Sequence, residues 1–189
     1  PCYVVSEKHL RANLSLIKSV AESAGVEIIM AFKAFALWKV FPIVRDYISC
    51  STASSLSEAN LAVDEMKNLA HTYAPVYTDK EVDEIAKLSS HITFNSISQF
   101  EKYKNRLEVD GRKISAGLRI NPEYSAVETD LYNPCAPGSR LGVTLDNLKK
   151  ADITGIDGCH CHTLCESTSY ELEKTLKIIE ERFGEFLPK

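Results

Sequence analysis

The 189-residue sequence lacks several patterns that would place it in a common class of protein. It has no apolar run near the roughly 18–20 residues that a membrane-spanning helix needs. It also has no cluster of lysine or arginine that could follow a phosphate backbone, and its formal net charge is −4. We therefore expect neither a membrane protein nor a nucleic-acid-binding protein. The composition, 44% hydrophobic and 25% charged residues, is that of an ordinary globular domain.

The arrangement of glycine and cysteine excludes further classes. No G-x-G-x-x-G motif follows an apolar run, which weakens the case for a dinucleotide-binding fold. All 8 glycines are isolated, so no glycine-rich turn is there to present backbone N–H groups to a phosphate. The 6 cysteines form no C-x-x-C pair and no regular framework. This spacing favours a reducing cytosol, and hence a cytoplasmic protein, over a disulfide scaffold.

The sequence does contain an alternation of short apolar runs and helical patterns. Four Ser/Thr-x-x-Glu capping boxes, whose two side chains satisfy backbone N–H groups reciprocally, follow apolar or β-rich runs. These boxes are Ser55–Glu58, Thr78–Glu81, Ser98–Glu101 and Thr168–Glu171. Six strands are predicted, over residues 28–33, 48–53, 70–76, 92–96, 114–120 and 156–163.

Helices are predicted between and around these strands. A first helix begins after Ser6 and ends at Gly25. Two shorter helices are expected, near Leu37–Tyr47 and over Leu145–Lys150. The last helix is expected to bury one stripe of apolar side chains, namely Leu172, Leu176, Ile179 and Phe183.

Alternating strands and helices predict an α/β protein with a parallel sheet, either a doubly wound open sheet or a (β/α)₈ TIM-type barrel. Residues that do chemistry in a barrel lie at the C-terminal ends of its strands. Several predicted strands end in polar or ionisable residues, namely Lys33, Thr52, Asn95, Arg119 with Asn121, and His160 with His162. We therefore favour the barrel, incomplete, with about six of its eight βα units in residues 1–189.

Lys33 is the most informative candidate for catalysis. It follows the apolar run Ile28–Phe32, and no other charge lies between Glu27 and Lys39. A lysine is rarely buried unless its amine has a partner or a task. Burial lowers the pKa of an amine, which makes it a nucleophile toward a carbonyl group. The alternative is a lysine at a strand end whose ammonium extends into solvent.

The segment Gly158–Glu166 contains three cysteines and two histidines, which are ligand types that zinc prefers. On a strand, however, His160 and His162 share one face while Cys159 and Cys161 share the other. A flat strand cannot gather both pairs around one ion, so we expect no metal site. The cysteines are expected to pack against helices, and the histidines to face the barrel interior.

Arg119 and Asn121 fall on one face at the end of the fifth predicted strand. An interior arginine there suits an anionic oxygen, or a hydrogen bond that fixes an aromatic ligand. An ion pair with a neighbouring carboxylate is the alternative.

The stretch from 123 to 142 is a long loop rich in turn residues, and loops of that length are often functional. Its acidic residues are Glu123, Glu128 and Asp130. They could recognise a cationic ligand, with Glu123 as the candidate substrate contact, or they could simply be solvated.

Five segments together carry a family resemblance: Ala31–Ala36, Thr52–Glu58, Leu118–Ser125, Tyr132–Gly142 and His160–Glu166. They resemble carboxynorspermidine (carboxyspermidine) decarboxylase, of the alanine-racemase-like, fold-type III group of pyridoxal-phosphate enzymes. The stretches Asn-Pro-Cys-Ala-Pro-Gly-Ser-Arg-Leu-Gly and His-Thr-Leu-Cys-Glu favour this branch over ornithine or diaminopimelate decarboxylases.

The resemblance implies that Lys33 binds pyridoxal 5′-phosphate covalently and that His162 stacks on the cofactor ring. It also implies that Arg119 lies near the cofactor. Cys159 and Cys161 depart from the pattern, because larger apolar residues are expected there. Since these positions face the helices, we expect the departure to affect packing more than chemistry.

The resemblance further implies a lyase of polyamine biosynthesis that decarboxylates carboxynorspermidine or carboxyspermidine and forms a homodimer when full length. We expect the cofactor's phosphate loop, the carboxylate partner of its ring nitrogen, two more barrel units and a β-rich second domain to lie beyond Lys189. We therefore expect residues 1–189 alone to be inactive. The alternatives are a cofactor-handling protein of the same barrel fold, another fold-type III amino-acid decarboxylase, and a zinc-binding module.

Overall fold

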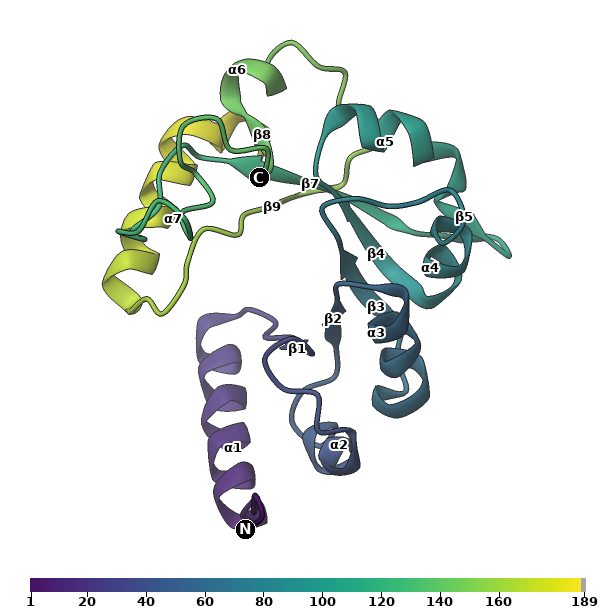
Figure 1. The fold of residues 1–189 in the computed structure, drawn as a ribbon, viewed down its shortest axis with the longest axis vertical. Coiled ribbons are helices and arrows are strands. Elements are labelled where there is room, and N and C mark those ends of the chain that lie inside the picture. Colours follow the sequence, from purple (N-terminus) through teal and green to yellow (C-terminus); the bar gives the residue numbers. More distant parts are fainter. Residues whose placement is uncertain (188–189) are drawn as a thin grey trace.

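The computed structural model describes residues 1–187, and its centre is a curved sheet with helices on its outer side (Figure 1). Every strand pairing in this seven-stranded sheet is parallel. The path runs through β1 (Met30–Ala31), β2 (Ser51–Ala53), β3 (Ala70–Tyr73), β4 (Ser89–Phe94), β7 (Ser115–Asn121) and β8 (Val143–Thr144), and β9 (Gly158–His160) also pairs with β7. Parallel pairing brings the C-terminal ends of all these strands to one rim of the sheet.

The sheet branches at β7, because two successive parts of this strand pair with different strands. Its residues 117–119 pair with β9, and its last two residues pair with β8. The main path ends in β1 on one side and β8 on the other, β9 branches off it at β7, and within residues 1–187 no strand joins β1 to β8 or β9. The sheet is therefore an open part of a barrel, as the sequence predicted, with the short β8 as an addition that the sequence did not reveal.

The helices cover the outer side of the sheet, where the apolar side chains gather (Figure 1). The α-helices are α1 (Glu7–Ala24), α2 (Phe41–Val44), α3 (Leu56–Leu61), α4 (Val82–Leu88), α5 (Ile97–Tyr103), α6 (Leu145–Leu148) and α7 (Ser169–Phe183). Short 3-10 turns lie at Trp38–Val40, Lys104–Arg106 and Gly184–Phe186, and a π-helical segment at Ala62–Met66 extends α3. None of the described helices has the length and apolar character required to cross a bilayer.

Two apolar clusters hold the helices to the sheet. The larger one centres on Phe94, Leu118 and Phe183, each no more than 1% exposed, and joins β4 and β7 to α4, α5 and α7. The smaller one centres on Phe41 and Met66 and joins β1 and β2 to α1, α2 and α3. Helices thus bind the sheet from one side, and the other side is left for polar side chains.

Three of the four predicted capping boxes need correction. Thr168 and Glu171 form a complete box at the start of α7, as predicted. At α3 the Ser55 hydroxyl accepts the Glu58 N–H at 3.2 Å, but the Glu58 carboxylate accepts the N–H of Ser54 instead of Ser55. At α4 the Thr78 hydroxyl donates to the Glu81 side chain, and the helix begins only at Val82.

The box predicted at Ser98 is wrong by two residues. The cap of α5 is Ser96, whose hydroxyl accepts the Gln99 N–H at 3.3 Å, while the Gln99 side chain accepts the Asn95 N–H. Glutamine replaces glutamate as the returning side chain, which the Ser/Thr-x-x-Glu search did not cover.

Two further predictions about elements need correction. Leu172 and Leu176 of α7 are 43% and 54% exposed, and the buried stripe is Thr175, Ile179 and Phe183. The helix is therefore rotated relative to the expected orientation. A hairpin of β5 (Glu108–Val109) and β6 (Arg112–Lys113) was also missed, although its Asp-Gly turn is a common hairpin signal.

Candidate active site

The C-terminal rim of the sheet gathers the polar residues that the sequence singled out. Lys33 lies in the turn after β1, and Arg119 near the end of β7. His162 lies two residues beyond β9, and Asn95 directly follows β4. Because parallel strands end at the same rim, these residues meet although they are far apart in the sequence.

Lys33 and His162 are in direct contact across the open part of the barrel. The Lys33 Nζ lies 3.3 Å from the His162 Nε2. An ammonium can only donate, so with Lys33 protonated the His162 Nε2 accepts and the ring proton lies on Nδ1. Lys33 is exposed, as in the alternative of a lysine at a strand end whose ammonium extends outward. Only Met30 and Phe32 of the preceding apolar run are buried. The role of Lys33 therefore rests on this contact, since the expected burial is absent.

The two histidines beside Lys33 are held in the neutral form. Burial lowers the pKa of His162, and the charges of Lys33 and Arg119 lower it further. Burial likewise lowers the pKa of His160 to about 4, assisted by His162, Arg119 and Lys33. Neutral imidazole rings can stack on a flat ligand and accept hydrogen bonds without adding charge to the two cations already present.

Arg119 is almost fully buried, with 5% of its surface exposed. Its Nη1 donates to the Tyr73 hydroxyl, and its Nη2 donates to the His162 carbonyl at 3.1 Å. Among residues 1–187 no carboxylate forms an ion pair with it. The guanidinium thus keeps its full positive charge beside the loop that carries His162.

Sequence reasoning missed three aromatic residues on the inner face of the sheet. Tyr73 stacks on His160 with ring centroids 4.9 Å apart. His71 and His91, which are register partners on β3 and β4, stack at 3.9 Å. Period-two alternation places His71 and Tyr73 on the same face, a signal that could have identified them.

These side chains surround a cavity of about 400 Å³ on the inner side of the sheet. Its lining includes Thr52, His71, Tyr73, His91, Thr93 and His160. The His160 Nε2 is buried and has no hydrogen-bond partner within the described part of the chain. The cavity therefore combines apolar surface with several polar side chains, and His160 leaves hydrogen-bonding capacity unused there.

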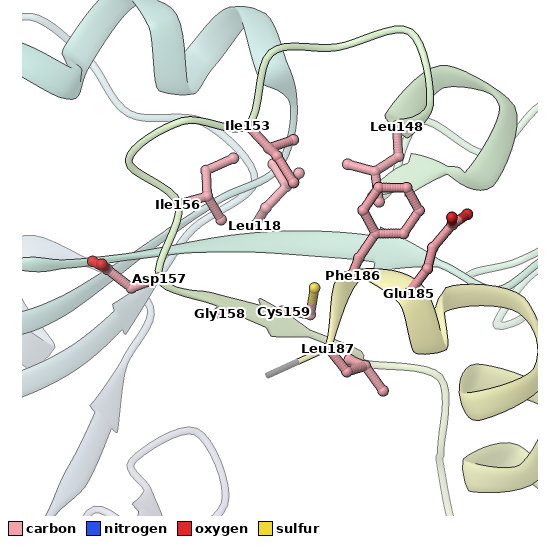
Figure 2. Close-up of a pocket in the computed structure, with 10 residues that line it drawn as sticks. All are labelled: Leu118, Leu148, Ile153, Ile156, Asp157, Gly158, Cys159, Glu185, Phe186 and Leu187. Carbon is pink, nitrogen blue, oxygen red and sulfur yellow. The ribbon is translucent and has the colours of Figure 1, made fainter. Parts of the chain in front are cut away.

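The cysteines beside these histidines lie on the opposite face, as predicted. Cys159 and Cys161 pack against the larger apolar cluster. Figure 2 shows the Cys159 side chain in a cavity of about 300 Å³ between β9 and the segment that follows α7, beside Phe186 and Leu187. Among residues 1–187 no group of three or more histidine, cysteine or acidic side chains is placed to hold a metal ion.

The structure does not bring Glu123 into the contacts of Lys33, His162 and Arg119. Its carboxylate forms an ion pair with Arg182 of α7, whose other nitrogen donates to the Pro122 carbonyl at 2.6 Å. Glu123 instead lines a separate cavity of about 450 Å³ formed by the loop from 121 to 144.

Asn121, predicted to point the same way as Arg119, is also buried, with 4% of its surface exposed. Its side-chain oxygen accepts the Glu123 N–H at 2.8 Å, so it shapes the start of the loop.

Two curated relatives of this chain are both decarboxylases. A carboxyaminopropylagmatine decarboxylase of Synechocystis is 47% identical over the whole chain, which covers 48% of that protein. A carboxynorspermidine/carboxyspermidine decarboxylase of Campylobacter jejuni is 40% identical over 99% of the chain, which again covers 48% of the relative. The chain thus spans about half the length of the curated relatives it matches. No protein-family model matches it.

A solved structure agrees with these relatives. The crystal structure of carboxynorspermidine decarboxylase with norspermidine from Campylobacter jejuni superposes with a TM-score of 0.87 and 38% identity. The match covers 98% of this chain and 47% of that one. The comparisons therefore confirm the resemblance read from the sequence: over its whole length this chain matches part of a carboxynorspermidine/carboxyspermidine decarboxylase, within the fold-type III pyridoxal-phosphate enzymes.

Proposed function

We propose that the protein is a pyridoxal-phosphate-dependent carboxy-lyase that removes the carboxylate of a carboxylated polyamine, in polyamine biosynthesis. The observation that carries this proposal is the contact between the Lys33 amine and the His162 ring at 3.3 Å, at the strand-end rim beside Arg119. An amine, a neutral aromatic ring and a guanidinium are what a flat, anionic aldehyde cofactor requires.

The residues present fit pyridoxal phosphate. Lys33 would hold it covalently through its amine, and the His162 ring offers a flat face for its pyridine ring. Arg119 contributes a buried positive charge that no carboxylate among residues 1–187 pairs with. The orphaned Nε2 of His160 marks unused hydrogen-bonding capacity on the same inner face. When bound, the cofactor supplies an electron sink for the electron pair released as carbon dioxide leaves.

The residues of the chain would divide the remaining tasks. Lys33 would hold the cofactor through its amine, and when that amine is free it would be placed to move a proton at the rim, 3.3 Å from the His162 Nε2. His162 orients the ring and, because its pKa is lowered, adds no competing positive charge. Arg119, held by Tyr73, keeps the His162 segment in place through its carbonyl.

The substrate class follows from the relatives. Both are named for substrates that carry a carboxylate on a polyamine or agmatine-derived chain, and the solved relative holds norspermidine. We propose that this chain accepts the same class, carboxynorspermidine or carboxyspermidine first. The exposed acidic residues of the loop are candidates for the distant ammonium groups of such a substrate, and Glu123 would have to exchange its ion pair with Arg182 for that contact.

We further propose that residues 1–189 form the N-terminal part of the cofactor-binding barrel, and that the complete enzyme works as a cytoplasmic homodimer. The open sheet and the match to about half of each relative support the barrel assignment. The free cysteines at 2, 50, 135, 159, 161 and 165 suit a reducing compartment.

The test is release of carbon dioxide by the complete enzyme, of which residues 1–189 are proposed to be a part, supplied with pyridoxal phosphate. Carboxynorspermidine, carboxyspermidine and carboxyaminopropylagmatine are compared with ornithine, lysine and meso-diaminopimelate at equal concentrations. The proposal expects turnover of the first group and little of the second. A clear preference for any of the second group would identify another fold-type III decarboxylase.

A cofactor-handling protein of the same fold is the second candidate. The exposure of Lys33 favours it, since a binder needs the lysine but no enclosed site. Such a protein would bind pyridoxal phosphate through Lys33 and release no carbon dioxide from any of these six compounds.

A further inference from the structure

Tyr73 occupies the centre of the hydrogen-bond network at the strand-end rim. The Tyr73 hydroxyl donates to the Asn95 Oδ1 at 3.1 Å and accepts from the Arg119 Nη1. Its ring is fixed as well, because it stacks on His160 with an interplanar angle of 22°. A tyrosine hydroxyl has one proton to donate, and here that proton and one lone pair are both used.

Arg119 depends on Tyr73 for its orientation. One guanidinium nitrogen binds the Tyr73 hydroxyl and another binds the His162 carbonyl, so the two acceptors fix the plane of the group. Tyr73 accepts through an uncharged O–H group, so it positions the guanidinium without cancelling its charge. An aspartate in that place would hold Arg119 equally well but would neutralise it.

Asn95 extends the network to the end of the long loop. Its Oδ1 accepts both the Tyr73 hydroxyl and the Gly142 N–H at 3.0 Å, and its Nδ2 donates to the Arg140 carbonyl at 2.9 Å. Every polar atom of this side chain is therefore engaged. The loop that begins after β7 is therefore tied at its far end to Asn95, which in turn accepts the hydroxyl of Tyr73, the residue that binds Arg119.

Gly142 provides a second link between the loop and Arg119. Its φ of +83° lies in the left-handed region, and a Cβ there would come within 3.0 Å of the Ile120 carbonyl and 3.1 Å of the Arg119 Cγ. The loop backbone therefore packs directly on the stem of the Arg119 side chain.

From this geometry we propose that Tyr73 is a positioning residue that sets the place of Arg119 and, through Asn95, locks residues 140–142 of the loop to the same site. Its catalytic consequence rests on the proposed function. The mechanical coupling does not, because it involves only residues of this chain. Removing one hydroxyl should loosen both Arg119 and the loop end, which are 46 and about 67 residues away in sequence.

Tyr77 offers a matched control. It is buried where Tyr73 is half-buried, and its hydroxyl accepts the Ala74 N–H and has two carbonyl acceptors for its single proton, Thr93 at 2.9 Å and Thr72 at 3.1 Å. It faces the helices, however, and belongs to the larger apolar cluster. Tyr73→Phe and Tyr77→Phe therefore each delete one bonded phenol hydroxyl, on opposite sides of the same sheet.

The experiment is hydrogen exchange of backbone amides in the cofactor-free protein, measured for wild type, Tyr73→Phe and Tyr77→Phe. Tyr73→Phe should raise exchange at residues 140–142 about tenfold, with core amides of β4 nearly unchanged. Tyr77→Phe should raise exchange in β3 and β4 without singling out 140–142. Asn95→Ala, which removes both loop contacts directly, should reproduce the local pattern of Tyr73→Phe.

The result that overturns the proposal is exchange at 140–142 in Tyr73→Phe that equals wild type, or a rise there no larger than that in Tyr77→Phe. A second measurement tests the consequence at the site. Titration with pyridoxal phosphate should show weaker binding to Tyr73→Phe than to Tyr77→Phe, by about tenfold. If wild type binds no cofactor, the proposed function fails while the exchange result still decides the coupling.

Discussion

The two faces of the sheet differ in chemistry although they are built from the same strands. On β4, Ile92 and Phe94 point toward the helices and are completely buried, whereas His91 and Thr93 line the inner cavity. On β9, Cys159 packs against the larger apolar cluster, while the next residue, His160, stacks on Tyr73. A shift of one residue along a strand therefore separates packing from potential chemistry.

The inner face is unusual for a barrel of this type. Barrel interiors are commonly filled with layers of branched apolar side chains. Here the cavity is lined by histidine, threonine and tyrosine, and its contacts are ring stacking and hydrogen bonds. Apolar packing on the outer face therefore contributes most of the stability, while the inner face holds the groups that the proposed reaction needs.

The strongest test of the inner face is Lys33→Ala. In the complete enzyme, activity should fall by at least about a thousandfold, because the residue proposed to hold the cofactor is lost. Lys39→Ala is the matched control, since Lys39 lies in the same segment with its ammonium over the Trp38 ring. Steady-state rates of carbon dioxide release check both. Equal loss in the two variants would contradict the assignment.

The strongest test of the outer face is Phe94→Ala. The ring is completely buried and packs edge-on against Tyr77 and Phe100. Its removal should cost about 3–5 kcal/mol of unfolding free energy. The neighbouring Thr93→Ala, on the inner face, should cost less than about 1 kcal/mol. Urea denaturation of the pair measures the difference, and similar values for the two would break the comparison.

The stability of the protein should depend on pH because His160 on the inner face is held neutral. The folded protein keeps His160 neutral down to a pKa of about 4, whereas an unfolded histidine takes up a proton near pH 6.5. Stability should therefore fall as pH drops from about 6.5 to about 4, by at most about 3 kcal/mol from this residue.

His160→Phe keeps an aromatic ring against Tyr73 and removes the titrating group. The variant should lose that part of the pH dependence, as measured by denaturation at pH 7, 5.5 and 4.5. An unchanged slope between wild type and variant would show that His160 titrates normally in the folded protein.

His162→Ala should produce the smallest of these effects. Ring stacking and edge contacts of this kind contribute roughly 0.5–1.5 kcal/mol, so cofactor affinity should weaken by about tenfold at most. Fluorescence or absorbance titration with pyridoxal phosphate measures it. Loss of activity that excess cofactor does not partly restore would instead give His162 a direct chemical role.

Much of the fold could be predicted because strand and helix periods differ. The alternation of β and α units, the parallel sheet and the opposite faces of the Gly158–Glu166 histidines and cysteines all follow from local pattern. The orientation of α7 could not be predicted this way. Leu172 and Leu176 were expected to be buried with Ile179 and Phe183, but the buried stripe instead continues through Thr175, whose hydroxyl donates to the Glu171 carbonyl.

The candidate site divides in the same way. Lys33, Arg119 and His162 could be named because they end strands and match a family pattern. Tyr73 could not, because its importance lies in contacts to Asn95 and Arg119 that only the folded sheet creates. The extent of burial at Lys33 was likewise beyond local pattern, since it depends on where other strands and loops lie.

The central claim is that Lys33 is the residue to which the cofactor attaches. The most direct test is borohydride reduction of the protein mixed with pyridoxal phosphate, followed by proteolysis and mass spectrometry. The account predicts one labelled peptide, the one that contains Lys33, and no comparable label on Lys39. Labelling of another lysine with Lys33 unmodified would contradict it.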